Sequence, residues 1–362
     1  MSVTTALIAA FSAMLLTQAA DSERYETASP SGEIVGQVWL NEEGGLRYTV
    51  NRQGRPIVAA SALSLEVRGA PDMRHGLRVV GVVRSNRDTS WRPVYGERSE
   101  IQNSYHELVV DLEVGDSKRG DAAPPLRMQL RKRAYNEGVA ICYAIPEQPA
   151  LAGVHLANER TEFRFTDDHV AWPVYSAQGR YDEVPLSQVK PGCERPLVLR
   201  IDEELYVALA EARLVDYARM KLAPLEGAEH ALVSRLNGAV EADLPLVTPW
   251  RVIIIGSSPG ELLENNDLLL NLNDPCAIDD VSWIKPGKVI REVTLTTDGG
   301  KACVDFAAER NLQYVEFDAG WYGHEYSDQS DATTVTLDPK RSRGPLDLAA
   351  VIRYAEQRDV GV

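Results

Sequence analysis

The sequence predicts a β-sandwich domain followed by an α/β segment with a parallel sheet. Between residues 33 and 255, short apolar runs alternate with polar residues and are separated by Gly, Pro, Asn and Asp, as in antiparallel β proteins. After residue 255 the pattern changes to strand, helix, strand, helix and strand, the order that builds parallel sheets. With 362 residues the chain is also long enough for two domains, at ~150 residues each.

Residues 1–20 are predicted to be a secretory signal peptide. The apolar stretch Thr5–Leu16 is too short to cross a bilayer, and the small residues Ala19 and Ala20 suit a cleavage site. The first charged residue is Asp21, so the basic start of a signal is missing and a disordered or truncated leader is the alternative. We therefore expect a secreted or periplasmic protein that does not bind membranes after signal removal.

Residues 21–270 are predicted to form the β-sandwich domain. Many short strands in one stretch, each with one apolar face, indicate a large sandwich. A polar segment rich in Gly and Pro, residues 115–125, is expected to be a loop. The clearest predicted strands are residues 34–40, 46–50, 138–145, 205–209 and 250–255.

Residues 271–362 are predicted to form the α/β part. Apolar residues recur at helical spacing in the two predicted helices, which would therefore cover a parallel sheet. A complete eight-unit barrel takes ~250 residues, whereas residues 289–362 number only 74, so a barrel could only begin here. The predicted strands are residues 289–295, 313–317 and 360–362, and the predicted helices are residues 301–310 and 346–358.

Composition excludes some partners. Acidic residues outnumber basic ones by 53 to 38, a formal net charge of −15, so the chain would repel nucleic acid and anionic lipid. The four cysteines form no CxxC pair, and we expect them to be buried and unpaired, although an oxidising compartment would permit a disulfide. They are Cys142, Cys193, Cys276 and Cys303.

One motif resembles a serine hydrolase but fails on mechanism. Residues 256–260 fit GxSxG, yet the oxyanion donor after Ser258 would be Pro259, which has no N–H. A helix N-cap at Ser257 or Ser258, ahead of Glu261, is the better interpretation. The sequence contains no HExxH, Walker A, strand-linked GxGxxG or EF-hand pattern.

The segment after the second α/β strand is the most suggestive one. Asp318 would lie at the carboxyl end of that strand, where barrel active sites assemble, and Trp321 follows closely. A carboxylate accepts sugar hydroxyls and an indole packs on the C–H patch of a pyranose. Alternatively, Asp318 caps a loop and Trp321 is core. His324 is expected to be a loop histidine, and Glu211 alone suggests only a solvated strand end.

Several sequence motifs, in the same order along the chain, resemble those of glycoside hydrolase family 97 over roughly residue 33 to the end. The resemblance agrees with the β-then-α/β order derived above, and it is carried by both halves of the chain. The motifs are Arg133–Ala140, Ser258–Glu264, Asn271–Asn273, Asp280–Lys288, Asp318–Tyr322 and Ser330–Thr333.

The resemblance implies a fold and a function. Such enzymes are secreted or periplasmic exo-acting glycosidases that release terminal α-linked glucose or galactose from oligosaccharides. Their architecture is an amino-terminal β-supersandwich, a (β/α)8 TIM barrel and a small carboxy-terminal β domain. A calcium ion (Ca2+) lies beside the sugar, and Glu211 matches the ligand that the amino-terminal domain supplies. Asp318 and Trp321 are the expected substrate-binding residues.

The resemblance favours one branch of the family and implies that the catalytic carboxylates lie outside this chain. Ile290–Val293 stands where the inverting α-glucosidases carry a tryptophan-rich stretch, so the chain is closer to the retaining branch that includes α-galactosidases. The family's catalytic carboxylates come from later barrel strands, so we expect none in this chain and no activity from the 362 residues alone. The alternative is a non-catalytic carbohydrate-binding β-sandwich module. Oligomeric state stays open.

Overall fold

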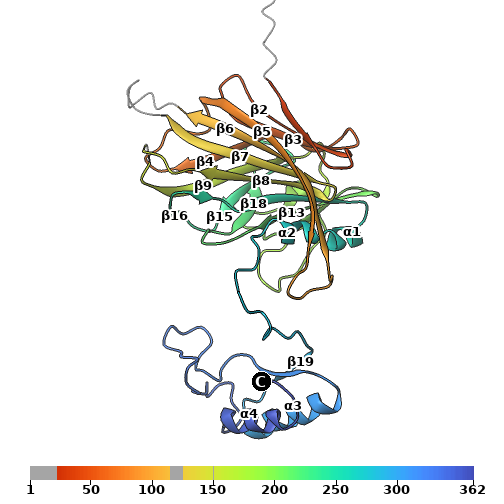
Figure 1. Cartoon of the computed structure of the whole chain (residues 1–362), viewed down its shortest axis with the longest axis vertical. Helices are drawn as coiled ribbons and strands as arrows, with labels where there is room; N and C mark the ends of the chain where they lie inside the picture. The colour runs from red at the N-terminus through yellow and green to blue at the C-terminus, as the bar shows by residue number, and fades with distance from the viewer. Residues whose placement is uncertain (1–22, 115–124, 150) are drawn as a thin grey trace, which may run out of the picture. The chain divides into compact units, whose positions relative to one another are not determined.

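The computed structural model describes residues 23–114, 125–149 and 151–362 (Figure 1). The predicted signal peptide and most of the predicted loop at residues 115–125 lie outside these ranges. Two compact units are present: the first comprises the chain up to residue 93 and residues 98–276, and the second comprises residues 94–97 and 277–362. Each unit is described by itself.

The first unit contains two antiparallel sheets. One has the strand order β1-β2-β3-β4-β9-β15-β14, with β16 also paired to β9. Its strands are β1 (Tyr25–Ala28), β2 (Ile34–Leu40), β3 (Leu46–Arg52), β4 (Arg55–Val67), β9 (Gly153–Arg164), β14 (Met220–Pro224), β15 (Ala231–Leu236) and β16 (Val240–Asp243).

The second sheet has the order β11-β10-β12-β13-β18-β8-β7-β6-β5, with β17 paired to β8. A short 3-10 helix, Leu186–Gln188, follows β11. The strands are β5 (Leu77–Trp91), β6 (Ile101–Val114), β7 (Leu126–Tyr135), β8 (Gly138–Ile145), β10 (Val170–Trp172), β11 (Val184–Pro185), β12 (Leu197–Asp202), β13 (Leu205–Ala212), β17 (Leu246–Val247) and β18 (Trp250–Gly256).

The two sheets enclose one apolar core, so the predicted sandwich-like β domain is confirmed. Inward-facing residues of both sheets, such as Val38 and Tyr48 in one and Leu130 and Ile253 in the other, belong to a single buried cluster. Strands β8 and β18 are buried at every position because a second cluster covers their other face. Short helices α1 (Pro259–Glu264) and α2 (Asp267–Asn271) supply Leu262 and Leu268 to that cluster.

Helix α1 begins as the N-cap interpretation requires. The Ser258 hydroxyl accepts the backbone N–H of Glu261 at 3.2 Å, and Pro259 occupies the first turn, where its missing N–H costs nothing. In return, the Glu261 carboxylate accepts the backbone N–H of Ser257 at 2.6 Å. The GxSxG match is therefore a helix start and not a nucleophile elbow.

The second unit is a small α/β arrangement. Strands β19 (Val289–Glu292) and β20 (Tyr314–Phe317) pair in parallel, and Gly361 makes a further parallel bridge to Tyr314. Helices α3 (Thr297–Glu309) and α4 (Leu348–Glu356) pack on one face through Val304, Ala307, Val351 and Ala355. These elements match the expected strand–helix order, but the structure shows only this small sheet, and a barrel is not confirmed.

The prediction that the cysteines are buried holds for only two of the four. The cysteines, all within the described part of the chain, are unpaired; Cys142 and Cys193 are buried, whereas Cys276 is exposed. No helix in the described ranges is both long and apolar enough to cross a membrane.

Candidate functional site

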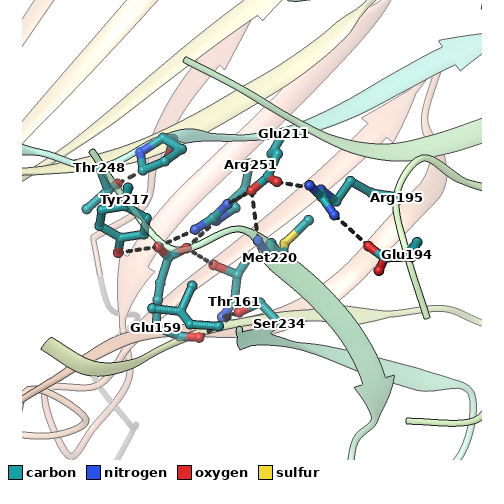
Figure 2. Close-up of polar contacts among 12 residues, drawn as sticks. Glu159, Thr161, Glu194, Arg195, Glu211, Tyr217, Met220, Ser234, Thr248 and Arg251 are labelled. Carbon is teal, nitrogen blue, oxygen red and sulfur yellow. Dashed lines mark hydrogen bonds and ion pairs between the residues drawn. The ribbon is translucent and has the colours of Figure 1, made fainter. Parts of the chain in front are cut away.

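Glu211 lies on β13, directly opposite Arg251 of β18 in the strand register. Its side chain is only 5 % exposed, so it is not the solvated charge that the isolated sequence suggests. Oε2 accepts Arg251 Nη1 at 2.7 Å and the backbone N–H of Met220 at 3.0 Å. Oε1 makes an ion pair with Arg195 Nε (Figure 2). Two guanidinium groups therefore compensate the charge of this carboxylate.

Behind Arg251 lies a second buried carboxylate, Glu159 of β9. Arg251 contacts both of its oxygens, Nε to Oε1 at 2.5 Å and Nη2 to Oε2 at 2.7 Å, and the two side chains are 1 % and 0 % exposed. Burial alone would lower the pKa of Arg251, but the adjacent Glu159 raises it overall. Because β9 and β18 belong to different sheets, this pair joins the two layers of the sandwich.

Two hydroxyl groups donate further hydrogen bonds to Glu159. Tyr217 donates to Oε2 at 3.0 Å and Thr161 donates to Oε1 at 3.1 Å (Figure 2). Burial is the largest cause that raises the pKa of the Tyr217 phenol, so it remains a proton donor. The buried charges are thus paired and hydrogen-bonded, which is the condition under which they can be tolerated inside a protein.

The network continues outward through Arg195. Arg195 Nη1 contacts Glu194 Oε2 at 2.7 Å, and Glu194 Oε1 lies 3.1 Å from Lys221 and 3.2 Å from the half-exposed Arg219. A chain of alternating charges therefore runs from the sandwich interior to the surface, and Glu211 is its central member.

Glu211 fits calcium only as one ligand of a larger set. Among the described residues its Oε1 has no hydrogen-bond donor in good geometry, which leaves a lone pair, although the cationic Arg195 faces it. No group of three or more His, Cys, Asp or Glu side chains in the described ranges could hold a metal. Since calcium takes six to eight oxygens, these residues do not make a calcium site on their own.

Asp318 and Trp321 belong to the second unit, whereas Glu211 belongs to the first. Asp318 immediately follows β20, and its Oδ2 pairs with Arg291 Nη2. Trp321 is half-buried and packs edge-on against Tyr322, with ring centroids 5.1 Å apart. The expected placement of Asp318 at the carboxyl end of a parallel strand is therefore observed.

Sequence reasoning missed Arg251, Glu159 and the pairing of Arg291 with Asp318. The signal for Arg251 was an arginine inside an otherwise apolar strand, between Trp250 and Val252. No comparable signal marks Glu159, whose partner is 92 residues away in sequence.

Comparison with known proteins decides the family. The family model described as glycosyl-hydrolase 97 N-terminal matches residues 27–275. The chain belongs to glycoside hydrolase family 97. A probable retaining α-galactosidase of Streptomyces bingchenggensis is 25 % identical over 360 residues, 95 % of this chain and 53 % of that protein. A retaining α-galactosidase of Bacteroides thetaiotaomicron is 23 % identical, over 94 % of this chain and 55 % of its own length.

Solved structures agree with this assignment. A family 97 enzyme from Pseudoalteromonas sp. strain K8, in complex with acarbose, superposes with a TM-score of 0.79 at 26 % identity. The match covers 93 % of this chain and 53 % of that one. A variant of that enzyme in complex with panose gives a TM-score of 0.78. The family 97 prediction is confirmed, and the chain spans about half the length of the curated relatives it matches.

Proposed function

We propose that this chain is the amino-terminal portion of a retaining glycosidase that removes terminal α-linked galactose from oligosaccharides. The observation that carries the proposal is the alignment of two retaining α-galactosidases with nearly the whole chain. Release of α-linked glucose is the second candidate, since the enzyme from Pseudoalteromonas sp. strain K8 was solved with acarbose and with panose. Residues 1–20, as a signal peptide, would direct the protein to the periplasm or the exterior.

Each predicted residue has a role in this proposal. Asp318, at the end of β20, would accept hydrogen bonds from sugar hydroxyls, and the Trp321 indole would pack on the apolar side of the ring. Glu211 would supply one carboxylate oxygen to a calcium ion, with Arg251 and the Met220 N–H fixing the other oxygen. The remaining ligands and both catalytic carboxylates would come from outside the described residues.

The distance between the two catalytic carboxyl groups distinguishes retaining from inverting glycosidases. A retaining glycosidase holds its two carboxyl groups ~5–5.5 Å apart and forms a glycosyl-enzyme, whereas an inverting one leaves ~6.5–9.5 Å for a water molecule. Because this chain would provide neither group, we expect the 362 residues alone to be inactive. A start of a (β/α)8 barrel in the second unit is part of the same proposal, and its supporting observation is the parallel pairing of β19 with β20.

The test uses the 362-residue chain and the complete polypeptide encoded by the same reading frame. We expect the complete protein to hydrolyse p-nitrophenyl α-galactoside faster than the α-glucoside, and the chain alone to hydrolyse neither. Proton NMR of a natural α-galactoside should show the α-anomer released first. Initial release of the β-anomer would refute retention. A frame that stops at Val362, with sugar binding but no turnover, would favour the carbohydrate-binding module.

A further inference from the structure

Among the described residues, helices α3 and α4 pack on one face of the small sheet in the second unit, and the other face carries charged residues. Helices α3 and α4 pack against Val315 on the opposite face, together with the partly buried Ile290 and Phe317. Arg291 and Glu316 are partners in the β19–β20 register, and both are exposed. Since strand side chains alternate between faces, Arg291 and Glu316 project away from the helices.

Asp318 continues this alternation two residues after Glu316, and it meets Arg291 there. Arg291 Nη2 pairs with Asp318 Oδ2, and the side chains are 52 % and 44 % exposed. The pair uses one carboxylate oxygen; within the described ranges Oδ1 accepts no hydrogen bond. A cation and an anion thus stand side by side at the carboxyl ends of two adjacent parallel strands, which is where ligands bind in α/β sheets.

The backbone under the pair is fixed by its surroundings. The buried Glu292 accepts the backbone N–H groups of Thr294 at 2.7 Å and Leu295 at 2.6 Å, which closes the loop after β19. The loop after β20 packs on it closely: a Cβ at Gly320 would lie 3.0 Å from Leu295. Hydrogen bonds and close packing thus hold the loops after β19 and β20, and these loops support the arrangement of Arg291 and Asp318.

We propose that Arg291 is a positioning residue that orients the Asp318 carboxylate toward a sugar hydroxyl. This inference rests on the proposed function. A pyranose hydroxyl can donate a hydrogen bond, and a carboxylate whose orientation is fixed by a neighbouring cation is well placed to accept it. The planar guanidinium holds its partner in one geometry, whereas the ammonium of a lysine would act only as a point charge.

The experiment measures kcat and KM for p-nitrophenyl α-galactoside with the complete enzyme. We expect Arg291→Ala to lower kcat/KM about 100-fold, with KM raised, because a misplaced carboxylate loses its hold on the sugar. Arg291→Lys should recover part of this loss. The matched control is Arg353→Ala, which removes an exposed arginine of α4 and should leave both constants unchanged.

A double-mutant cycle separates positioning from a structural role. If Arg291 acts through Asp318, then Arg291→Ala should change kcat/KM less than about 3-fold in an Asp318→Ala background. The melting temperature should stay constant in all variants; if Arg291→Ala does not fold, the Arg291→Lys enzyme is used in the cycle instead. Near-wild-type kcat/KM for Arg291→Ala, or effects that multiply independently, would overturn the inference alone. A wild-type enzyme that hydrolyses no α-glycoside would overturn the proposed function and the inference with it.

Discussion

Lys132 is a lysine in the core, and it makes the stability of the sandwich depend on pH. On β7 it occupies the inward row that also holds Met128 and Leu130, and it is 0 % exposed. Its ammonium donates to the backbone oxygen of Gly36 on β2, in the opposite sheet. Gly36 leaves just enough room, since a Cβ there would lie 2.7 Å from Lys132 Nζ.

Burial lowers the pKa of Lys132 from 10.5 to about 7, with Glu26 opposing the shift and Arg84 adding to it. Between pH 7 and 10.5 the unfolded chain therefore binds about one proton more than the folded chain. The free energy of unfolding must then rise with pH in this range. At 1.36 kcal/mol per pKa unit, charging the amine destabilises the fold by up to ~5 kcal/mol below pH 7. Between pH 6.5 and 8.5 the expected gain in stability is ~2 kcal/mol.

The perturbation is Lys132→Met, which keeps the length of the side chain and removes the titrating group. Urea unfolding of the 362-residue chain, followed by far-UV circular dichroism at pH 6.5, 7.5 and 8.5, gives the pH dependence for both proteins. The wild type should gain ~2 kcal/mol more than the variant over this range. Lys190→Met, at an exposed lysine, should keep the wild-type slope. Parallel wild-type and Lys132→Met curves would refute the reasoning.

Three further predictions concern the buried network and the first helix. Arg251→Met should destabilise the first unit by ~3–5 kcal/mol because Glu159 is left buried and unpaired, whereas Met at the exposed Arg235 should change the urea midpoint little. In the complete enzyme, Glu211→Gln should weaken the calcium dependence of activity; an unchanged calcium titration would show that Glu211 is not a calcium ligand. Ser258→Ala should lower the free energy of unfolding by ~1 kcal/mol, measured by urea denaturation, and no loss would mean that the cap is dispensable.

Local patterns predicted the elements well where one face of a strand is buried. Strands β2 and β3 alternate almost perfectly between buried and partly exposed positions, and their predicted ranges match the structure closely. The alternation of buried and partly exposed residues along β7 places Lys132 on the inward face, in the same row as apolar residues. The sequence alone does not say what its amine would contact. Period-two alternation reports burial, but the partner across the core is a property of the whole fold.

The first helix of the second unit shows where local propensity misleads. We expected it from residue 301, but Gly299 and Gly300, which are poor helix formers, lie inside it. The helix in fact begins at Thr297, capped by Thr296, which accepts the backbone N–H of Gly299 at 3.0 Å. Gly300 is required there, since a Cβ would lie 2.9 Å from the side chains of both Phe317 and Val351. Close packing outweighed the cost of glycine.

The site residues were harder to predict because their environment comes from long-range pairing. Glu211 alone suggests a solvated charge, yet the register of β13 with β18 places it against Arg251, and packing of the sheets brings Glu159 behind them. Asp318 was easier, since the end of a parallel strand can be located from the local pattern. The resemblance to the family named Glu211, but nothing in the sequence showed its arginine partners.

The two arginine–carboxylate pairs differ in what a mutation can reveal. Arg251 and Glu159 are buried, so either charge left alone would destabilise the fold, and a loss of activity in such a variant could not be separated from unfolding. Arg291 and Asp318 are about half exposed, and an ion pair in that setting contributes about 1 kcal/mol or less to stability. Their variants should therefore fold like the wild type. Under the proposed function, a change in kcat/KM at Arg291 or Asp318 would then report on sugar binding, and this makes the carboxyl edge of β19 and β20 an informative place to test that function.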